Sequence, residues 1–130
     1  MALKTVSDNF RAYAIVGEPT SLQRYLRANK KELGDLNKIY VDNYSLIFLF
    51  SFVFPSIECA RVLLKNGVKI DSMLMSINPL TYALENKIID FVRLFLEEGN
   101  YSNTILQHYY SIYKNKDWEY EYLRLIIEYM

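Results

Sequence analysis

A pattern that recurs about every 31 to 33 residues is the feature of this sequence that most restricts its fold. The segment Asp90–Glu97 reads DFVRLFLE, and the segment Glu121–Glu128 reads EYLRLIIE. Upstream, Ile57–Asp71 carries the same arginine among apolar residues, and Gly67 lies 32 residues before Gly99. A repeat of this length is typical of chains that stack small supersecondary units, because one unit cannot bury its apolar face alone.

The stretch Asn78–Asn103 shows what one such unit contains. Three of its residues follow the i, i+3, i+4 spacing of a short helix: Leu80, Ala83 and Leu84. A second helical stripe follows after a break: Phe91, Val92, Phe95 and Leu96. Pro79 suits a first helical turn, and Gly99 lies where a helix end favours positive φ. The stretch therefore predicts two short antiparallel helices followed by an extended link.

Copies of this unit divide the chain into four segments of similar length: 1–37, 38–70, 71–103 and 104–130. A chain of 130 residues, 52% of them hydrophobic, predicts a single domain with one continuous core. The second copy has one extra residue between its two helices. Its apolar run Leu46–Phe54 is too short to cross a bilayer, which needs about 20 residues, and predicts a helix with neighbours on both sides. We expect Arg27–Asn37 to be a solvated loop, and the last helix to bury Leu123, Ile126 and Ile127.

Charge and residue types argue against several functional classes. Fifteen Lys and Arg balance fifteen Asp and Glu, so a general nucleic-acid binder is not expected. The single cysteine, Cys59, lies on an apolar helical stripe and predicts a buried structural thiol. The single histidine, His108, has no sequence partner for catalysis and predicts a packing or surface role. Dinucleotide, phosphate-loop and zinc motifs are absent, so we expect no enzyme activity, no metal and no cofactor.

The unit Asn78–Asn103 resembles an ankyrin repeat, whose consensus reads TPLHxAAxxGHxxVVxLLLxxGADVN. It aligns over 26 residues without a gap, and eight positions match: Pro79, Leu80, Ala83, Val92, Leu94, Leu96, Gly99 and Asn103. Thr81 stands where the consensus has His, and Lys87 where it has Gly. The resemblance implies an all-α ankyrin-repeat solenoid of about four helix–turn–helix units with short β-hairpin-like loops. Thr81 would then have only one hydroxyl with which to connect neighbouring hairpins.

The resemblance also implies where a partner protein binds, because ankyrin-like arrays use their hairpin tips and the exposed side of their first helices. The second segment then contributes Val41, Asp42 and Tyr44 from its hairpin, and Phe52 and Val53 from the end of its first helix. The third contributes Leu74, Met75, Ile77, Glu85 and Asn86, and the fourth contributes Tyr113 and Lys114. Apolar and tyrosine side chains at a solvent-facing edge are common in protein-binding surfaces. Met73, Leu74 and Met75 could alternatively pack between neighbouring hairpins.

These observations predict a non-catalytic protein–protein interaction module that binds through its concave hairpin and first-helix face. The degenerate repeats and the composition are similar to those of viral or intracellular-bacterial ankyrin proteins, which implies a host protein as partner. The expected location is intracellular, in the cytoplasm, with no membrane and no nucleic-acid partner. The alternative is a structural or self-associating N-terminal repeat array of a larger assembly, in which a homodimer is one form.

Overall fold

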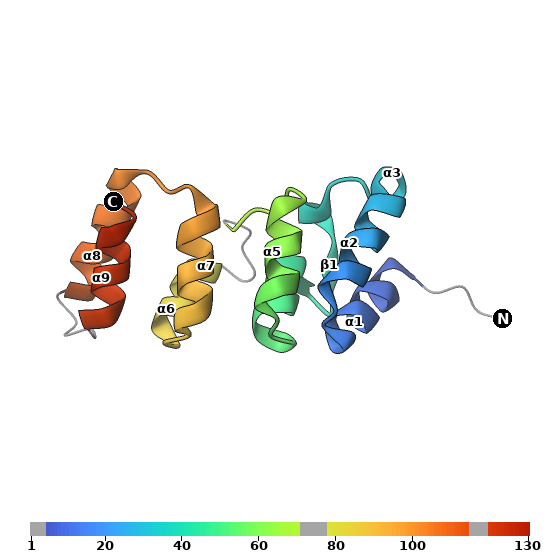
Figure 1. Cartoon of the computed structure of the whole chain (residues 1–130), viewed down its shortest axis with the longest axis horizontal. Helices are drawn as coiled ribbons and strands as arrows, with labels where there is room; N and C mark the ends of the chain where they lie inside the picture. The colour runs from blue at the N-terminus through green and yellow to red at the C-terminus, as the bar shows by residue number, and fades with distance from the viewer. Residues whose placement is uncertain (1–4, 71–77, 115–119) are drawn as a thin grey trace. The chain divides into compact units, whose positions relative to one another are not determined.

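The computed structural model describes residues 5–70, 78–114 and 120–130, which belong to two compact units, Met1–Pro79 and Leu80–Met130 (Figure 1). Most of the described residues are helical, which confirms the expected all-α class. A two-stranded hairpin is the one sheet among them. The single domain predicted over 1–130 stays a prediction, and the two units are described in turn.

The N-terminal unit begins with α1 (Val6–Val16) and α2 (Pro19–Ala28), whose ends follow the usual capping rules. Thr5 forms a capping box with Asp8, and Gly17 ends α1 with a left-handed φ of 71°. The side chain of Glu18 accepts hydrogen bonds from the first backbone N–H groups of α2. The inward faces of both helices are apolar and buried: Phe10, Ala14, Leu22 and Leu26.

The solvated loop expected over Arg27–Asn37 is instead partly helical. It contains α3 (Lys30–Leu33) and the 3-10 turn η1 (Leu36–Lys38). Gly34 ends α3 at φ 64°, and the carboxylate of Asp35 accepts a hydrogen bond from the Asn37 backbone N–H to start η1. Short polar residues that bond to nearby backbone groups therefore give this segment a fixed shape.

A tight hairpin follows, made of β1 (Tyr40–Val41) and β2 (Tyr44–Ser45). The strands are antiparallel, and Val41 pairs with Tyr44. Both turn residues, Asp42 and Asn43, have positive φ, at 52° and 69°. Two left-handed residues define a type I′ turn, whose twist matches that of the strands.

The next helix contains a widened turn. It starts as α4 (Leu46–Phe48) and continues as the π-helical turn η2 (Leu49–Val53), where the Phe54 N–H donates to the Leu49 carbonyl at 2.9 Å. A π-turn is a helix with one residue inserted, so η2 accommodates the extra residue seen in the sequence. Residues Leu46 to Ser51 are all buried, which confirms a helix with neighbours on both sides. Helix α5 (Ile57–Lys65) completes the pair and also packs against α2.

The C-terminal unit holds α6 (Pro79–Glu85), α7 (Ile89–Gly99), α8 (Asn103–Lys114) and α9 (Tyr120–Glu128). The two stripes predicted within 78–103 are buried as expected. In α9 the prediction is partly wrong, because the buried residues are Tyr122, Leu125 and Ile126, whereas Ile127 is 50% exposed.

Two helix ends in this unit differ from a simple glycine rule. The left-handed residue after α7 is Asn100 and not Gly99, and a Cβ on Gly99 would collide with the Tyr101 ring. Between α6 and α7, Lys87 adopts a positive φ of 55°, at the position where the ankyrin consensus has a glycine. Residues 71–77, with the predicted site residues Leu74, Met75 and Ile77, lie outside the described parts.

Candidate protein-binding surface

The tip of the β1–β2 hairpin presents two tyrosines to solvent. Tyr40 is 47% exposed and Tyr44 is 37% exposed. They lie on either side of the Asp42–Asn43 turn, and the register places them on opposite faces of the hairpin, since Tyr40 pairs with Ser45 and Tyr44 with Val41. Tyrosine is enriched in the contact surfaces of protein complexes, so the two residues are candidate contacts at this tip.

Helix α1 holds this tip in place. The Arg11 guanidinium bonds both carboxylate oxygens of Asp42, at 2.8 and 3.1 Å, and reaches the Asp8 carboxylate at 3.0 Å. The Ser7 hydroxyl donates to the Tyr40 carbonyl at 3.2 Å. The hydrogen bond and charge of Asp42, with those of Asp8, raise the pKa of Arg11. The hairpin is therefore fixed to the first helix before any partner arrives.

Of the predicted site residues in the N-terminal unit, Tyr44 and Asp42 are exposed, but Val41 is not. Val41 is fully buried, so its prediction as a contact residue is wrong. Neighbouring residues of a strand point to opposite sides, and here Val41 faces the core whereas Tyr40 faces solvent. Phe52 is half-buried, with its ring 5.0 Å from that of Phe48.

In the C-terminal unit, Glu85, Asn86 and Lys114 are exposed, and Tyr113 is not. Tyr113 is only 2% exposed, and its hydroxyl donates to the Glu85 carboxylate at 3.2 Å. Its prediction as a contact residue is therefore wrong, because α8 places this ring in the core of the unit. The Lys114 ammonium instead lies 5.7 Å from the Tyr110 ring centre.

A pair of tyrosines connects α8 to α6. The Thr81 hydroxyl lies 3.0 Å from the Tyr109 hydroxyl, so Thr81 does connect neighbouring helix pairs with its single oxygen. The Tyr109 and Tyr113 rings are stacked, with centres 6.4 Å apart. Burial raises the pKa of Tyr113, and the neighbouring Glu85 charge raises it further. Glu85 therefore has a structural bond that the sequence did not reveal.

One exposed residue of the hairpin, Tyr40, was missed by the prediction. It had a readable signal, because a tyrosine stands on each side of the turn-forming pair Asp42–Asn43. Val53, which was predicted as a contact at the end of the first helix of the second segment, is 38% exposed.

The groups considered for chemistry belong to different units. Cys59 is fully buried, and burial raises the pKa of its thiol. His108 is exposed on α8 beside Tyr109. Within residues 5–70, 78–114 and 120–130, no group of three or more His, Cys, Asp and Glu side chains is placed to hold a metal ion.

No family model, curated protein or solved structure matches this chain. Over the described residues, no helix has the length and apolarity needed to cross a membrane. The function is accordingly inferred from the chain's own residues.

Proposed function

We propose that this chain is a non-catalytic, ankyrin-type repeat protein that binds a partner protein through the tip of its β1–β2 hairpin. The observation that carries the proposal is the fixed hairpin, with Tyr40 and Tyr44 exposed at its end. A partner inside a host cell fits the resemblance to viral and intracellular-bacterial ankyrin proteins. Glu85, Asn86 and Lys114 are further candidate contacts, on the C-terminal unit.

The ankyrin-type architecture is supported by the recurrence of one helix pair in each unit. The pair α4–η2/α5 corresponds in sequence to the pair α6/α7, apart from the residue that the π-turn accommodates. Gly67 follows α5 at φ 98°, as a left-handed residue follows α7. The hairpin precedes the first of these pairs, where the resemblance expects one.

The chemistry of the tip favours protein over other partners. Tyrosine offers a large, rigid contact area that loses little conformational entropy on binding. A loop that is already held in its final shape also loses less on association. The buried Val41 side chain, the Ser7–Tyr40 hydrogen bond and the Arg11–Asp42 pair together provide that restraint. Asp42 thus acts in positioning the tip more than in direct contact.

Capture of a partner from a eukaryotic cell lysate tests this function. We expect the double variant Tyr40→Ala/Tyr44→Ala to retain at least tenfold less of a partner that wild type binds, because interface tyrosines each contribute about 1–2 kcal/mol or more. The matched control is Ile15→Ala/Val16→Ala, which removes exposed apolar side chains from α1. Both variants need unchanged circular dichroism. Equal capture by all three proteins would contradict the proposal.

Self-association is the second candidate, favoured by apolar side chains on terminal helices. In the N-terminal unit, α1 exposes Val6, Ile15 and Val16, and Val16 is 71% exposed. In the C-terminal unit, Ile105, Ile127 and Met130 are each at least 40% exposed. Such an array would assemble through these exposed helix faces. Sedimentation over a range of concentrations tests it, with Ile15→Glu and Ile127→Glu expected to give a monomer; a wild-type monomer at every concentration would exclude it.

A further inference from the structure

A hollow of about 220 Å³ lies in the N-terminal unit, away from the hairpin tip residues described above. It is bounded by the end of α2, by the α3–η1 segment and by the end of α5. Its floor is aliphatic and its rim is cationic and amide-bearing, and its lining residues are Leu26, Lys30, Leu33, Gly34, Leu36, Lys65 and Asn66. Nothing in the hairpin proposal uses these residues.

Two asparagine side chains hold the walls of this hollow. The Asn37 amide donates to the Gly67 carbonyl at 3.0 Å and accepts from the Lys69 N–H at 2.8 Å, so it fixes the η1 segment to the loop after α5. The Asn66 amide donates to the Gln23 side chain at 2.9 Å and to the Val62 carbonyl at 2.7 Å, so it fixes the end of α5 to α2. The hollow therefore has walls that are fastened to each other and does not depend on a ligand for its shape.

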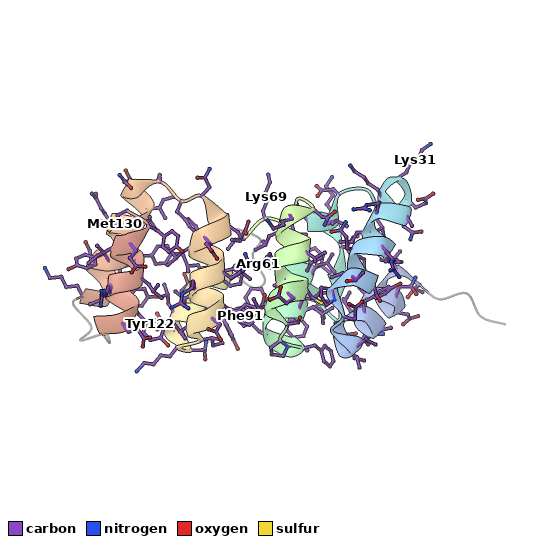
Figure 2. The ribbon with its side chains drawn as sticks, viewed as in Figure 1. Lys31, Arg61, Lys69, Phe91, Tyr122 and Met130 are labelled. Atoms are coloured by element: carbon purple, nitrogen blue, oxygen red, sulfur yellow. The ribbon has the colours of Figure 1, made fainter. Side chains whose placement is uncertain are left out.

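Positive charge is concentrated around it. Segments 27–38 and 65–69 carry six cationic residues, Arg27, Lys30, Lys31, Lys38, Lys65 and Lys69, against two anionic residues, Glu32 and Asp35. Asp35 accepts two hydrogen bonds from Asn37. These bonds, with the nearby charges of Lys38 and Lys69, lower its pKa, so it offsets part of the positive charge on the Lys38 and Lys69 side. Figure 2 shows Lys31 at α3 and Lys69 just beyond α5, on the same edge of the N-terminal unit.

The zero net charge of the chain hides this asymmetry. Residues 1–79 contain ten Lys and Arg and seven Asp and Glu, whereas residues 80–130 contain five and eight. The N-terminal unit is thus cationic by three charges, and most of its cations lie on the two segments around the hollow. A local field of this kind attracts anionic groups even though the whole chain is neutral.

The size and the floor of the hollow decide between classes of anion. Sites for drug-sized molecules and cofactors usually measure about 300–1,000 Å³, which is larger than this one. Single-stranded nucleic acid is recognised by aromatic rings on which its bases stack, and the lining here has leucines in their place. A volume of about 220 Å³ instead suits one or two aliphatic side chains.

We propose that this hollow is a second binding site, for an acidic peptide segment of a partner protein. An aliphatic side chain of the peptide enters between Leu26, Leu33 and Leu36, and flanking carboxylates meet Lys30 and Lys65 at the rim. The Asn66 side chain and the fixed backbone around Gly34 set the width of the entrance. This site is independent of the hairpin tip and recognises different chemistry.

The test is a titration of the ¹⁵N-labelled chain with an acetylated peptide of one leucine flanked on each side by three glutamates. We expect amide shifts that cluster at Lys30, Leu33, Gly34, Leu36 and Asn66. Replacing every glutamate by glutamine, or the leucine by glycine, should weaken binding at least tenfold and several-fold respectively. Shifts spread over lysines of both units would overturn the proposal, as would a tighter fit of an oligothymidine at this site.

Variants separate the two halves of the interaction. Lys30→Glu/Lys65→Glu should weaken the peptide at least tenfold, whereas the matched control Arg93→Glu/Arg124→Glu, which makes the same charge change on exposed residues of the C-terminal unit, should keep wild-type affinity. Leu33→Asn keeps the charge and should weaken binding several-fold. An unchanged affinity for Leu33→Asn would mean attraction by charge alone and would overturn the site. Tyr40→Ala/Tyr44→Ala should bind this peptide as wild type does, so the two proposals fail separately.

Discussion

The two units of this chain hold neighbouring helices together with different side chains. The N-terminal unit uses side-chain amides and a guanidinium. Asn37 connects η1 to the loop after α5, Asn66 connects the end of α5 to α2, and Arg11 connects α1 to Asp42 of the hairpin. The C-terminal unit uses phenols, since Tyr109 meets Thr81 and Tyr113 meets Glu85. The amide and guanidinium contacts are exposed or half-buried, whereas Tyr113 is almost fully buried.

This difference separates two ways to make long-range order from a short repeat. The Asn37 amide bonds to backbone groups of the loop after α5, which any sequence provides, so this contact tolerates changes of side chain there. Phenols need a specific oxygen on the facing helix, and their rings also fill the core. We therefore expect the stability of the N-terminal unit to fall mainly when the Asn37 or Asn66 hydrogen bonds are removed. The stability of the C-terminal unit should instead depend on pH, through its buried tyrosine.

The largest effects should come from the two cores, tested one unit at a time. Phe50→Ala and Phe95→Ala each remove a fully buried ring, at a cost of about 3–5 kcal/mol in the free energy of unfolding. Urea unfolding measures the total, and hydrogen exchange shows where protection is lost. If the two units unfold independently, each variant lowers protection mainly in its own unit. Equal loss in both units for either variant would break the comparison.

Loss of the Asn37 hydrogen bonds should have the next largest effect on stability. Asn37→Ala removes two hydrogen bonds between η1 and the loop after α5, and we expect a loss of about 1–2 kcal/mol in unfolding free energy. The control is Asn86→Ala, because the Asn86 side-chain amide donates to the Tyr82 carbonyl of the adjoining helix α6, four residues away. A smaller loss for Asn37→Ala than for Asn86→Ala would show that the Asn37 hydrogen bonds do not stabilise the unit.

The tyrosine pair makes a prediction about pH. The folded state raises the pKa of Tyr113 above its ordinary value of about 10. The unfolded chain therefore loses this proton first, so the contribution of Tyr113 is complete below about pH 10 and is lost as pH rises further. Tyr113→Phe should cost about 1 kcal/mol at neutral pH and flatten the fall in stability above pH 10. Thermal unfolding from pH 7 to 11 measures both, with Tyr109→Phe as the control that leaves Glu85 bonded; a slope equal to that of wild type would contradict the assignment.

The smallest effect should be that of the exposed pair Arg11–Asp42. A double-mutant cycle with Arg11→Met and Asp42→Asn isolates its coupling energy, which should be small and should fall further as salt is raised from about 0.05 to 0.5 M. The measurement is chemical unfolding at each salt concentration. A coupling that does not respond to salt would mean that the pair acts through hairpin geometry rather than through charge.

The sequence predicts buried residues correctly where apolar residues follow the spacing of a helix. It fails where the direction of a single side chain depends on how the elements pack. The stripes Leu80–Leu84 and Phe91–Leu96 were readable because a core face repeats at a known period. Val41 and Tyr113 were placed at the surface by position within a repeat, yet one faces the core from a strand and the other from α8. The hollow was unreadable, because it depends on Asn37 bonding to the Gly67 backbone and on Asn66 bonding to the Gln23 side chain, and both partners are distant in sequence.

The π-turn η2 also has a consequence for how the length of this sequence can vary. The extra residue is accommodated in one wide turn, so the helix begins and ends where it would without the insertion. Ser45 therefore caps its start, and α5 packs against it. Removing one residue from Leu49–Val53 would return the helix to ordinary pitch. The wide turn is thus a position where the length of the chain can change by one residue while the helix start and the following helix α5 keep their contacts.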